Sequence, residues 1–345
     1  MELFDVVIVG AGIAGLSCAQ TLVRAGKRVV VLDRSGFVGG RCATKSPGLP
    51  SLPVDFGPVF VHGDDPEFVA WVESFGDDLV PGWPRVVEGG GTPCQPQAFD
   101  PLQRRYALKS GLRTLAESLA QGVEVVHGAL VVGLRWDDAG FLVGSADGRE
   151  FLGRNLVLTL ALEQTRGLLA GLGSGPGAET IRSADALLGQ FASLPCLTVL
   201  AWYPPGTPTP AWDLLYPERS PSILLVSNEG PKRGLDPSQG VLLLVQARPG
   251  WSHSRLEGDR GAGATELLAA TGALVGPWAG SPGAQVAHRW RYARLAPSDH
   301  LVRPLVLDRP GSTAKVGLAG DLFDVGGGLQ GAWRSGRNLG ARLVF

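Results

Sequence analysis

The sequence predicts an α/β fold of two domains. Three observations predict it. An apolar strand, a glycine-rich turn and a helix follow one another near the start, a second strand–glycine–helix pattern stands near the end, and a long central stretch has a different make-up. At 345 residues the chain is long enough for two hydrophobic cores. Since the pattern recurs at both ends, we expect one of the two domains to be assembled from both ends of the chain.

The first elements make a βαβ unit. Residues 4–9 (FDVVIV) form an apolar run that is typical of a strand buried on both faces. Residues 13–25 carry apolar side chains at helical spacing, and Gly26 can end that helix at the C′ position. Residues 28–32 (RVVVL) are the second buried strand, which ends at Asp33.

The elements that follow are less regular. Residues 47–100 are rich in Pro and Gly, with one helix expected at 66–75. Helices are also expected at 111–121, 163–171, 263–275 and 329–343. Strands are expected within 123–136, as a hairpin of 141–145 and 150–152, and at 155–160, 196–203, 222–227, 240–246, 284–290 and 314–319.

Composition and charge limit the partners. The formal net charge is −1, so nothing indicates binding to nucleic acid or to an anionic membrane. No apolar run reaches the roughly 20 residues of a membrane span, and no signal peptide is visible, so we expect a cytoplasmic protein. The four cysteines form no CxxC pair and the five histidines show no metal-ligand spacing, so we expect neither a redox dithiol nor a metal.

The strongest local signal is the G-x-G-x-x-G spacing of Gly10, Gly12 and Gly15. The first glycine permits a tight turn, the second lets a pyrophosphate approach the backbone, and the third lets helix and strand pack closely. The helix N-terminus offers free N–H groups to the phosphates. Asp33, after the second strand, can accept both ribose hydroxyls. The alternative is a glycine turn in an unrelated α/β unit.

Two further motifs indicate FAD instead of NAD. Gly39-Gly40-Arg41 follows the second strand, and Arg41 can neutralise the pyrophosphate or contact the flavin side. Near the end, Gly320-Asp321 offers a carboxylate to ribitol hydroxyls. Gly326-Gly327-Gly328 then leads into a helix whose positive end would face the electron-rich edge of the flavin. A surface arginine in a loop and a buried acid before a glycine-rich helix are the alternatives.

These blocks, taken in order along the chain, resemble the FAD-dependent amine oxidase superfamily and most closely its renalase-like branch. They are VVIVGAGIAGLSCAQTL, DRSGFVGGRCATKS, VDFGPVF, ALKSGLRTLAESLA, HRWRYAR and LAGDLFDVGGGLQGAWRSG. The resemblance implies a Rossmann-like FAD-binding domain of glutathione-reductase type with p-hydroxybenzoate-hydroxylase-like topology. A second, mixed-sheet α+β substrate domain completes the expected fold. We expect the FAD-binding domain over 1–75, 108–165 and 312–345 and the substrate domain over 76–107 and 166–311, with the active site between them.

The resemblance also implies the residues that bind FAD, here without a covalent link because the C-terminal block holds no cysteine. They are Gly10, Gly12, Ala14, Gly15, Asp33, Arg34, Gly40, Arg41, Val131, Gly320, Asp321, Leu329 and Gln330. The sequence departs from the family's pattern at 58–62 (PVFVH) and at the strand end VLTLAL, which lacks the usual Thr-Pro pair. Both places lie near the expected substrate face.

The candidate catalytic residues are His288, Trp290, Lys109 and His62. Because alternate strand residues share a face, His288, Trp290 and Tyr292 can form one wall over the flavin. The alternatives are a strand of the domain core, a surface lysine at Lys109 and a structural histidine at His62.

The function that the sequence predicts is oxidation of a small substrate by hydride transfer to flavin N5. The resemblance implies oxygen as the electron acceptor, hydrogen peroxide as a product, and isomeric dihydronicotinamide dinucleotides as the favoured substrates. Three alternatives remain open: an amine oxidase, a dehydrogenase or isomerase that does not react with oxygen, and an FAD-binding escort protein without turnover.

Overall fold

The computed structural model describes residues 2–45, 52–174 and 177–344. By its internal contacts the chain divides into two compact units. Unit 1 comprises residues 1–41, 115–193 and 295–345, and unit 2 comprises residues 42–114 and 194–294. Among the described residues no helix has the length and apolarity to cross a lipid bilayer.

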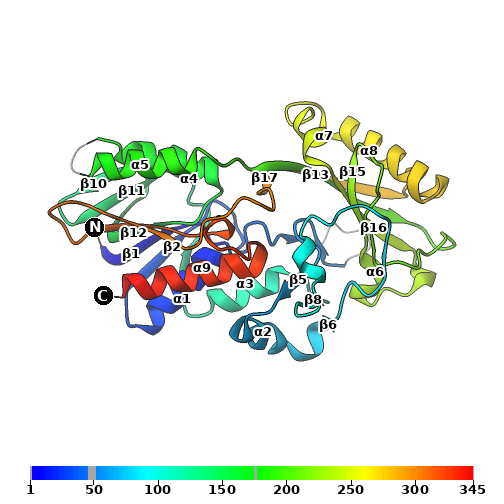
Figure 1. Ribbon diagram of the computed structural model, residues 1–345, viewed down its shortest axis with the longest axis horizontal. Helices are drawn as coiled ribbons and strands as arrows, with labels where there is room; N and C mark the ends of the chain where they lie inside the picture. Colours follow the sequence, from blue (N-terminus) through cyan, green and yellow to red (C-terminus); the bar gives the residue numbers. More distant parts are fainter. Residues whose placement is uncertain (1, 46–51, 175–176, 345) are drawn as a thin grey trace. The chain divides into compact units, whose positions relative to one another are not determined.

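Unit 1 is built on a sheet with a parallel centre (Figure 1). Its parallel neighbours run in the order β19-β12-β1-β2-β9, while β18, β11 and β10 are antiparallel additions. The strands are β1 (Leu3–Val9), β2 (Val29–Leu32), β9 (Glu124–Val126), β10 (Val131–Asp137), β11 (Gly140–Ser145), β12 (Glu150–Leu158), β18 (Leu305–Asp308) and β19 (Lys315–Leu318).

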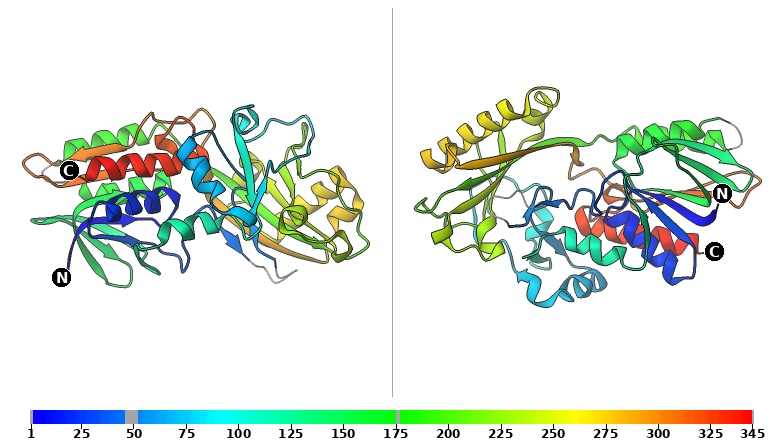
Figure 2. Two further views of the ribbon diagram at one scale, coloured as in Figure 1. Left: turned by 90° about the horizontal axis from the view of Figure 1, so that it is seen from below. Right: turned by 180° about the vertical axis from the view of Figure 1, so that it is seen from behind.

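Helices cover both faces of this sheet (Figure 2). The helices α1 (Ile13–Arg24) and α9 (Gly328–Leu343) lie on one face, and α4 (Leu162–Leu169) and α5 (Ala178–Leu188) lie on the other. Alternate strand residues serve the two faces, as the pleat requires. Val7 and Val9 of β1 join the core under α4 and α5, together with Leu162 and Ile181. The α/β fold with a Rossmann-like domain is therefore confirmed.

Two predicted elements of unit 1 need correction. The hairpin strand at 150–152 and the buried strand at 155–160 are one continuous strand, β12. Its first half pairs with β11 and its second half with β19, and β1 lies along its other edge. The predicted helix at 163–171 is shorter, since α4 ends at Leu169 and a 3-10 turn follows over Ala170–Leu172. The prediction had no helix at the place of α5.

Unit 2 contains a mixed six-stranded sheet in the order β17-β13-β16-β15-β14-β7. A three-stranded sheet β5-β8-β6 and a β3-β4 pair complete its strands. They are β3 (Thr44–Lys45), β4 (Val54–Asp55), β5 (Val61–Gly63), β6 (Leu79–Pro81), β7 (Val87–Glu88), β8 (Arg104–Leu108), β13 (Leu194–Tyr203), β14 (Leu214–Leu215), β15 (Ile223–Asn228), β16 (Val241–Ala247) and β17 (Ala284–Arg294).

Two cores lie against the two faces of the six-stranded sheet. Helix α8 (Arg260–Val275) packs on one face, where Leu267 meets Val199 and Val245. On the other face Leu200 and Leu244 pack against residues of the segment around Phe56. The remaining α-helices among the described residues are α2 (Pro66–Glu73), α3 (Arg113–Ala120), α6 (Glu229–Arg233) and α7 (Pro249–His253).

The contact units divide the chain at other places than the predicted domain boundaries. Residues 42–75 belong to unit 2 because Val54, Phe56 and Phe60 are part of its core. Residues 166–193 belong to unit 1 because Leu169 and Leu188 are part of its core. The expected domains follow the chain's motifs, whereas the contact units follow its buried side chains.

Candidate functional site

The glycine turn after β1 is shaped by close backbone contacts. Gly10 has a φ of +109°, a backbone conformation that residues with a side chain rarely adopt, so glycine is the residue that suits this position. A Cβ on Gly15 would lie 2.0 Å from the Gly10 carbonyl oxygen, so only glycine fits there. At Gly12, in contrast, a Cβ would meet nothing within 4 Å. Gly12 therefore leaves open space beside the start of α1, as a pyrophosphate would require.

Asp33 couples this turn to the end of β2. Its carboxylate accepts hydrogen bonds from the Ala11 N–H at 2.7 Å and from the Ser35 N–H at 2.8 Å. A carboxylate has about four lone-pair sites, so acceptor capacity remains for ribose hydroxyls. Val131 begins β10 next to this place, since the Ala129 N–H donates to the Asp33 carbonyl oxygen at 2.8 Å. Arg34 is exposed on the turn after Asp33.

The second glycine pair lies directly on the first turn. The Gly39 N–H donates to the Ala11 carbonyl oxygen at 2.8 Å. A Cβ on Gly40 would lie 3.5 Å from the Gly12 Cα. Two glycine-rich turns, one after β1 and one after β2, thus meet in unit 1.

The C-terminal helix α9 lies along α1 (Figure 1). A Cβ on Gly336 would lie 2.1 Å from the Ala14 carbonyl oxygen, and one on Gly340 would lie 2.8 Å from the Thr21 Cβ. The two helices therefore run in the same direction with their backbones in contact. Both begin at a glycine, Gly12 or Gly327, without a side-chain cap.

The start of α9 is fixed by polar contacts. Asp324 is buried and accepts hydrogen bonds from the Arg334 Nε at 2.7 Å and the Gly326 N–H at 2.9 Å. Gln330, in the first turn, is also buried, and Leu329 is half-buried. The first N–H groups of a helix have no partner within the helix, so α1 and α9 both offer donors and a partial positive charge.

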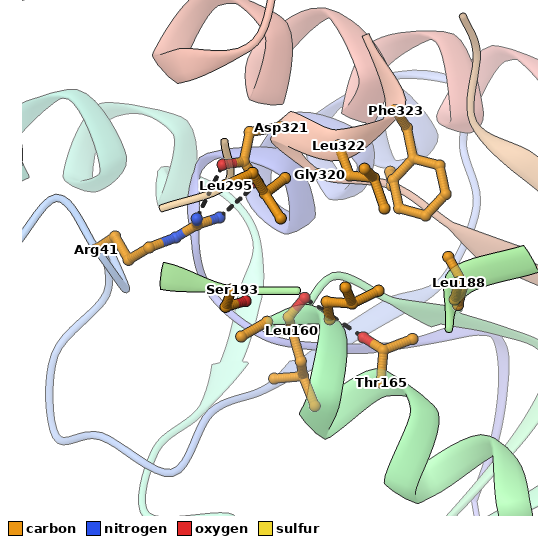
Figure 3. Close-up of a pocket in the computed structure, with 13 residues that line it drawn as sticks. Arg41, Leu160, Thr165, Leu188, Ser193, Leu295, Gly320, Asp321, Leu322 and Phe323 are labelled. Carbon is orange, nitrogen blue, oxygen red and sulfur yellow. Dashed lines mark hydrogen bonds and ion pairs between the residues drawn. The ribbon is translucent and has the colours of Figure 1, made fainter. Parts of the chain in front are cut away.

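Arg41 and Asp321 form a bidentate ion pair in unit 1 (Figure 3). The Arg41 Nη1 and Nη2 lie 2.8 and 2.7 Å from the two oxygens of Asp321. The two side chains are 35% and 20% exposed, so both are accessible to a polar ligand. Gly320, just before the acid, is fixed by the Ser335 hydroxyl, which donates to its carbonyl oxygen at 2.8 Å.

A small pocket adjoins this ion pair. The residues that line it include five leucines, Leu160, Leu162, Leu188, Leu295 and Leu322, together with the polar side chains of Thr165 and Ser193 (Figure 3). The predicted motif residues after β1, β2 and β19 thus all lie at the carboxyl edge of one parallel sheet. In open α/β sheets this edge is where ligands bind.

One residue of this region was missed by the sequence reasoning. The Thr159 hydroxyl can donate to two carbonyl oxygens. That of Gly10 lies 3.0 Å away and that of Val9 lies 3.1 Å away. It also limits the room at Gly10 and Gly15. Thr159 directly follows β12, at the place where the sequence lacks the Thr-Pro pair, and its hydroxyl contacts the glycine turn.

His288 and Trp290 lie together on β17 of unit 2, as the strand alternation predicted. The centroids of their rings are 4.4 Å apart in a T-shaped arrangement, and the Trp290 Nε1 donates to the Phe56 carbonyl oxygen at 2.9 Å. Burial, together with the charges of Lys45 and Arg260, lowers the pKa of His288 to about 4. The imidazole is therefore neutral at physiological pH.

The other two catalytic candidates have local partners. His62 is buried, with its Nδ1 2.8 Å from the Gln103 Oε1 and its Nε2 3.1 Å from the Gln95 Oε1. Because a neutral imidazole has one donor, one of these amides must turn its NH₂ group toward the ring. Lys109 is exposed, and its ammonium donates to the Asp77 carbonyl oxygen at 2.7 Å.

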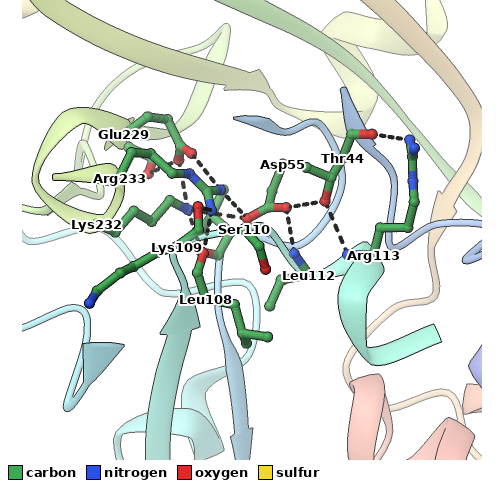
Figure 4. Close-up of polar contacts among 12 residues, drawn as sticks. Thr44, Asp55, Leu108, Lys109, Ser110, Leu112, Arg113, Glu229, Lys232 and Arg233 are labelled. Atoms are coloured by element: carbon green, nitrogen blue, oxygen red, sulfur yellow. Dashed lines mark hydrogen bonds and ion pairs between the residues drawn. The ribbon is translucent and has the colours of Figure 1, made fainter. Parts of the chain in front are cut away.

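A buried charge cluster in unit 2 was also missed (Figure 4). Asp55, Glu229, Lys232 and Arg233 have side chains that are at most 2% exposed. Burial would raise the pKa of Asp55, but Arg233 and Lys232 hold it below its usual value. Among the described residues there is no group of three or more side chains that could hold a metal ion.

The class of domain is clear from comparison with known families. Residues 8–75 match the family described as the NAD(P)-binding Rossmann-like domain. The putrescine oxidase of Kocuria rosea is 42% identical over 72 residues, which are 21% of this chain and 15% of that enzyme. The chain thus matches only a small part of the relative's length in sequence.

In fold the similarity covers the whole chain. A putative protoporphyrinogen oxidase from Exiguobacterium sp. 255-15 has a TM-score of 0.70 at 14% identity, over 100% of this chain and 99% of that one. Cyclohexylamine oxidase from Brevibacterium oxydans IH-35A has a TM-score of 0.70 at 16% identity, over 99% and 98%. At these identities the structures show the fold alone. Together the matches support the predicted resemblance to the amine oxidase superfamily, while the renalase-like branch stays a prediction.

Proposed function

We propose that this protein is an FAD-dependent oxidoreductase of the amine oxidase type, with FAD held non-covalently by unit 1. The observation that carries the proposal is the pair of parallel helices α1 and α9, which both start at an uncapped glycine. Helix starts of this kind bind anions. One suits the pyrophosphate, and the other suits a second electron-rich end of a long dinucleotide.

The side chains around these helix starts fit the same cofactor. Asp33 is placed to accept ribose hydroxyls, while Arg41 and Asp321 offer a guanidinium and a carboxylate to the middle of the molecule. The open space at Gly12 admits a phosphate against the backbone. The remaining predicted cofactor residues lie in the same unit, and their contacts are part of the proposal.

The cofactor would supply the redox chemistry, because bound FAD accepts a hydride from the substrate and can pass the electrons to oxygen to give hydrogen peroxide. The protein's part is alignment. We place His288 and Trp290 against the substrate. Since the Trp290 N–H is engaged by Phe56, this residue offers its ring face, while the neutral His288 can accept a hydrogen bond.

His62 and Lys109 would have to release their present partners before they could meet a substrate. His62 is buried between two glutamine side chains, and Lys109 donates to a backbone carbonyl at the surface. We therefore rest the catalytic part of the proposal on His288 and Trp290.

On the basis of the sequence motifs, we favour a renalase-like oxidation of isomeric dihydronicotinamide dinucleotides. The match to putrescine oxidase favours a second candidate, the oxidation of an amine. The test is anaerobic reduction of the bound flavin, followed in the visible absorption band. The panel comprises putrescine, cyclohexylamine, and NADH and NADPH preparations that contain isomeric dihydropyridines.

Bleaching by the dihydropyridine isomers alone supports the renalase-like activity, and bleaching by amines alone assigns an amine oxidase. No bleaching by any of them contradicts both and leaves an FAD-binding protein without this chemistry. Slow reoxidation of the reduced flavin in air would replace the oxidase by a dehydrogenase.

A further inference from the structure

Segment 55–59 of unit 2 is held by side-chain donors from distant parts of the sequence. The Trp290 Nε1 donates to the Phe56 carbonyl oxygen at 2.9 Å, and the Gln246 Nε2 donates to that of Gly57 at 2.6 Å. The Lys232 ammonium donates to the carbonyl oxygen of Val59 at 2.6 Å. Three of the segment's carbonyl groups are thus each fixed by a side chain of β16, β17 or α6.

The start of the segment is fixed by the charge cluster (Figure 4). The Asp55 carboxylate accepts from the Arg233 Nη2 at 2.5 Å, the Thr44 hydroxyl at 2.6 Å and the Leu112 N–H at 2.8 Å. Arg233 also donates to the Leu108 and Lys109 carbonyl oxygens. The cluster therefore joins three separate backbone segments of unit 2 at one point.

Lys232 has contacts that a simple ion pair would not need. Its ammonium lies 2.9 Å from the Glu229 Oε1 and 4.4 Å from the centroid of the Trp83 ring, in addition to the Val59 carbonyl. Burial lowers the pKa of Lys232, although Glu229 opposes this shift. Buried ion pairs are weak stabilisers compared with apolar side chains of the same shape. What this arrangement provides beyond stability is a fixed backbone.

The fixed backbone supports the two residues that we place against the substrate. Trp290 is itself one of the donors, and the His288 ring packs on Phe56 with centroids 6.1 Å apart. Gln246 is oriented in turn by Arg294, whose Nη2 donates to the Gln246 Oε1 at 3.1 Å. All these contacts lie within unit 2.

We propose that Lys232 is a positioning residue, which fixes segment 55–59 and through it the placement of His288 and Trp290 for the reaction. The inference rests on the proposed function and deepens it. It identifies a buried lysine, which would not itself touch the substrate, as a determinant of alignment. Alignment is the main contribution that a protein makes to hydride transfer.

The test uses the FAD-loaded enzyme with the double substitution Glu229→Gln and Lys232→Met. This variant removes one charge of each sign, so Asp55 and Arg233 still balance each other, and we expect the variant to fold. The matched control is Arg255→Met with Glu266→Gln, which removes an exposed ion pair of the same unit with an N–O distance of 2.5 Å. The reductant is the panel member that bleaches the wild-type flavin fastest.

We expect the limiting rate of anaerobic flavin reduction to fall about tenfold or more in the Lys232 variant, because misplacement by about 1 Å is enough for such a loss. FAD content and the apparent dissociation constant of the reductant should stay within about twofold, and the control should match the wild type. Hydrogen exchange should rise in peptides that cover 54–63. An unchanged limiting rate would overturn the proposal.

A structural role alone gives a different result. It predicts a lower melting temperature and raised exchange throughout unit 2, with the rate falling only as far as FAD content falls, and that result would also overturn the proposal. If no panel member reduces the wild-type flavin, the proposed function fails separately. Hydrogen exchange of the Lys232 variant then decides whether Lys232 fixes segment 55–59. A rise in exchange confined to 54–63 supports the proposal, and no rise overturns it.

Discussion

The two units treat their backbone polar groups in opposite ways. In unit 1 the N–H groups at the starts of α1 and α9 have no side-chain cap, and glycines keep the space beside them open. In unit 2 three carbonyl groups of segment 55–59 accept hydrogen bonds from the side chains of Lys232, Gln246 and Trp290. Helix starts without a side-chain cap beside open space are features of a binding site, whereas occupied acceptors make a rigid support.

The difference also explains where charge is placed. Arg41 and Asp321 of unit 1 are paired but accessible, so a ligand can replace one partner by another. The charge cluster of unit 2 is sealed instead, because the side chains of Asp55, Glu229, Lys232 and Arg233 have almost no exposed area. The first arrangement can exchange its contacts on binding, and the second cannot do so without a large loss of stability.

The largest effect is expected from breaking the sealed cluster. Arg233→Met leaves Asp55 and Glu229 facing Lys232 alone, so the free energy of unfolding should fall by about 3–5 kcal/mol. Urea unfolding of the protein measures it. Adding Asp55→Asn removes the surplus negative charge and should restore part of the loss. A decrease below about 1 kcal/mol for Arg233→Met would show that the cluster is not sealed as described.

The glycine turn gives a sharper contrast between two neighbouring positions. Gly15→Ala places a Cβ 2.0 Å from the Gly10 carbonyl oxygen and should destabilise the FAD-free protein by about 2–3 kcal/mol. Gly12→Ala meets no protein atom, so stability should change by less than about 0.5 kcal/mol while FAD affinity falls about tenfold or more. Urea unfolding measures the effect on stability, and FAD titration measures the effect on affinity. Equal losses of stability in the two variants would contradict the open space beside Gly12.

His288 gives a smaller, pH-dependent effect. Its pKa of about 4 in the folded protein lies below the ordinary value of 6.5, so the unfolded chain binds the proton more readily. The contribution of His288 to stability is therefore complete above pH 6.5 and is lost as the pH falls toward 4. After a discount for partial exposure, the wild type should lose about 1–2 kcal/mol more than His288→Gln between pH 7 and pH 4. If the free energies of unfolding of the two proteins fell in parallel between pH 7 and pH 4, the prediction would be contradicted.

The smallest change in stability is expected at the accessible ion pair. Asp321→Asn should alter the free energy of unfolding of the FAD-free protein by less than about 1 kcal/mol, because partly exposed pairs contribute little. FAD affinity should fall in the same variant, since the amide is a weaker acceptor for ribitol hydroxyls. A large loss of stability without a loss of affinity would make the pair structural and not part of the site.

The sequence predicts unit 1 better than unit 2 for a physical reason. The contacts of Gly10, Gly12, Gly15 and Asp33 arise within one βαβ unit, so spacing alone places them. The pairing of α9 with α1 needed the motif at the other end of the chain, which Gly320 and Asp321 marked. Helix α5 was not predicted, and none of the motifs that guided the prediction lies within its range.

The charge cluster could not be predicted in the same way. Glu229, Lys232 and Arg233 stand in a short stretch of charges and turn residues, EGPKRG, which is typical of an exposed turn. The one local signal is its position between two strands that are buried along their whole length. Its partner Asp55 is far away in the sequence, and no spacing rule links the two.

The most direct test of the account is FAD binding by the purified protein, measured by the visible absorption band after FAD is added and the excess removed. We expect one FAD per chain, which denaturation releases into the supernatant because no cysteine of the C-terminal block can hold it. A protein without a flavin band after this treatment, or with flavin that stays on the denatured chain, would contradict the proposed cofactor site.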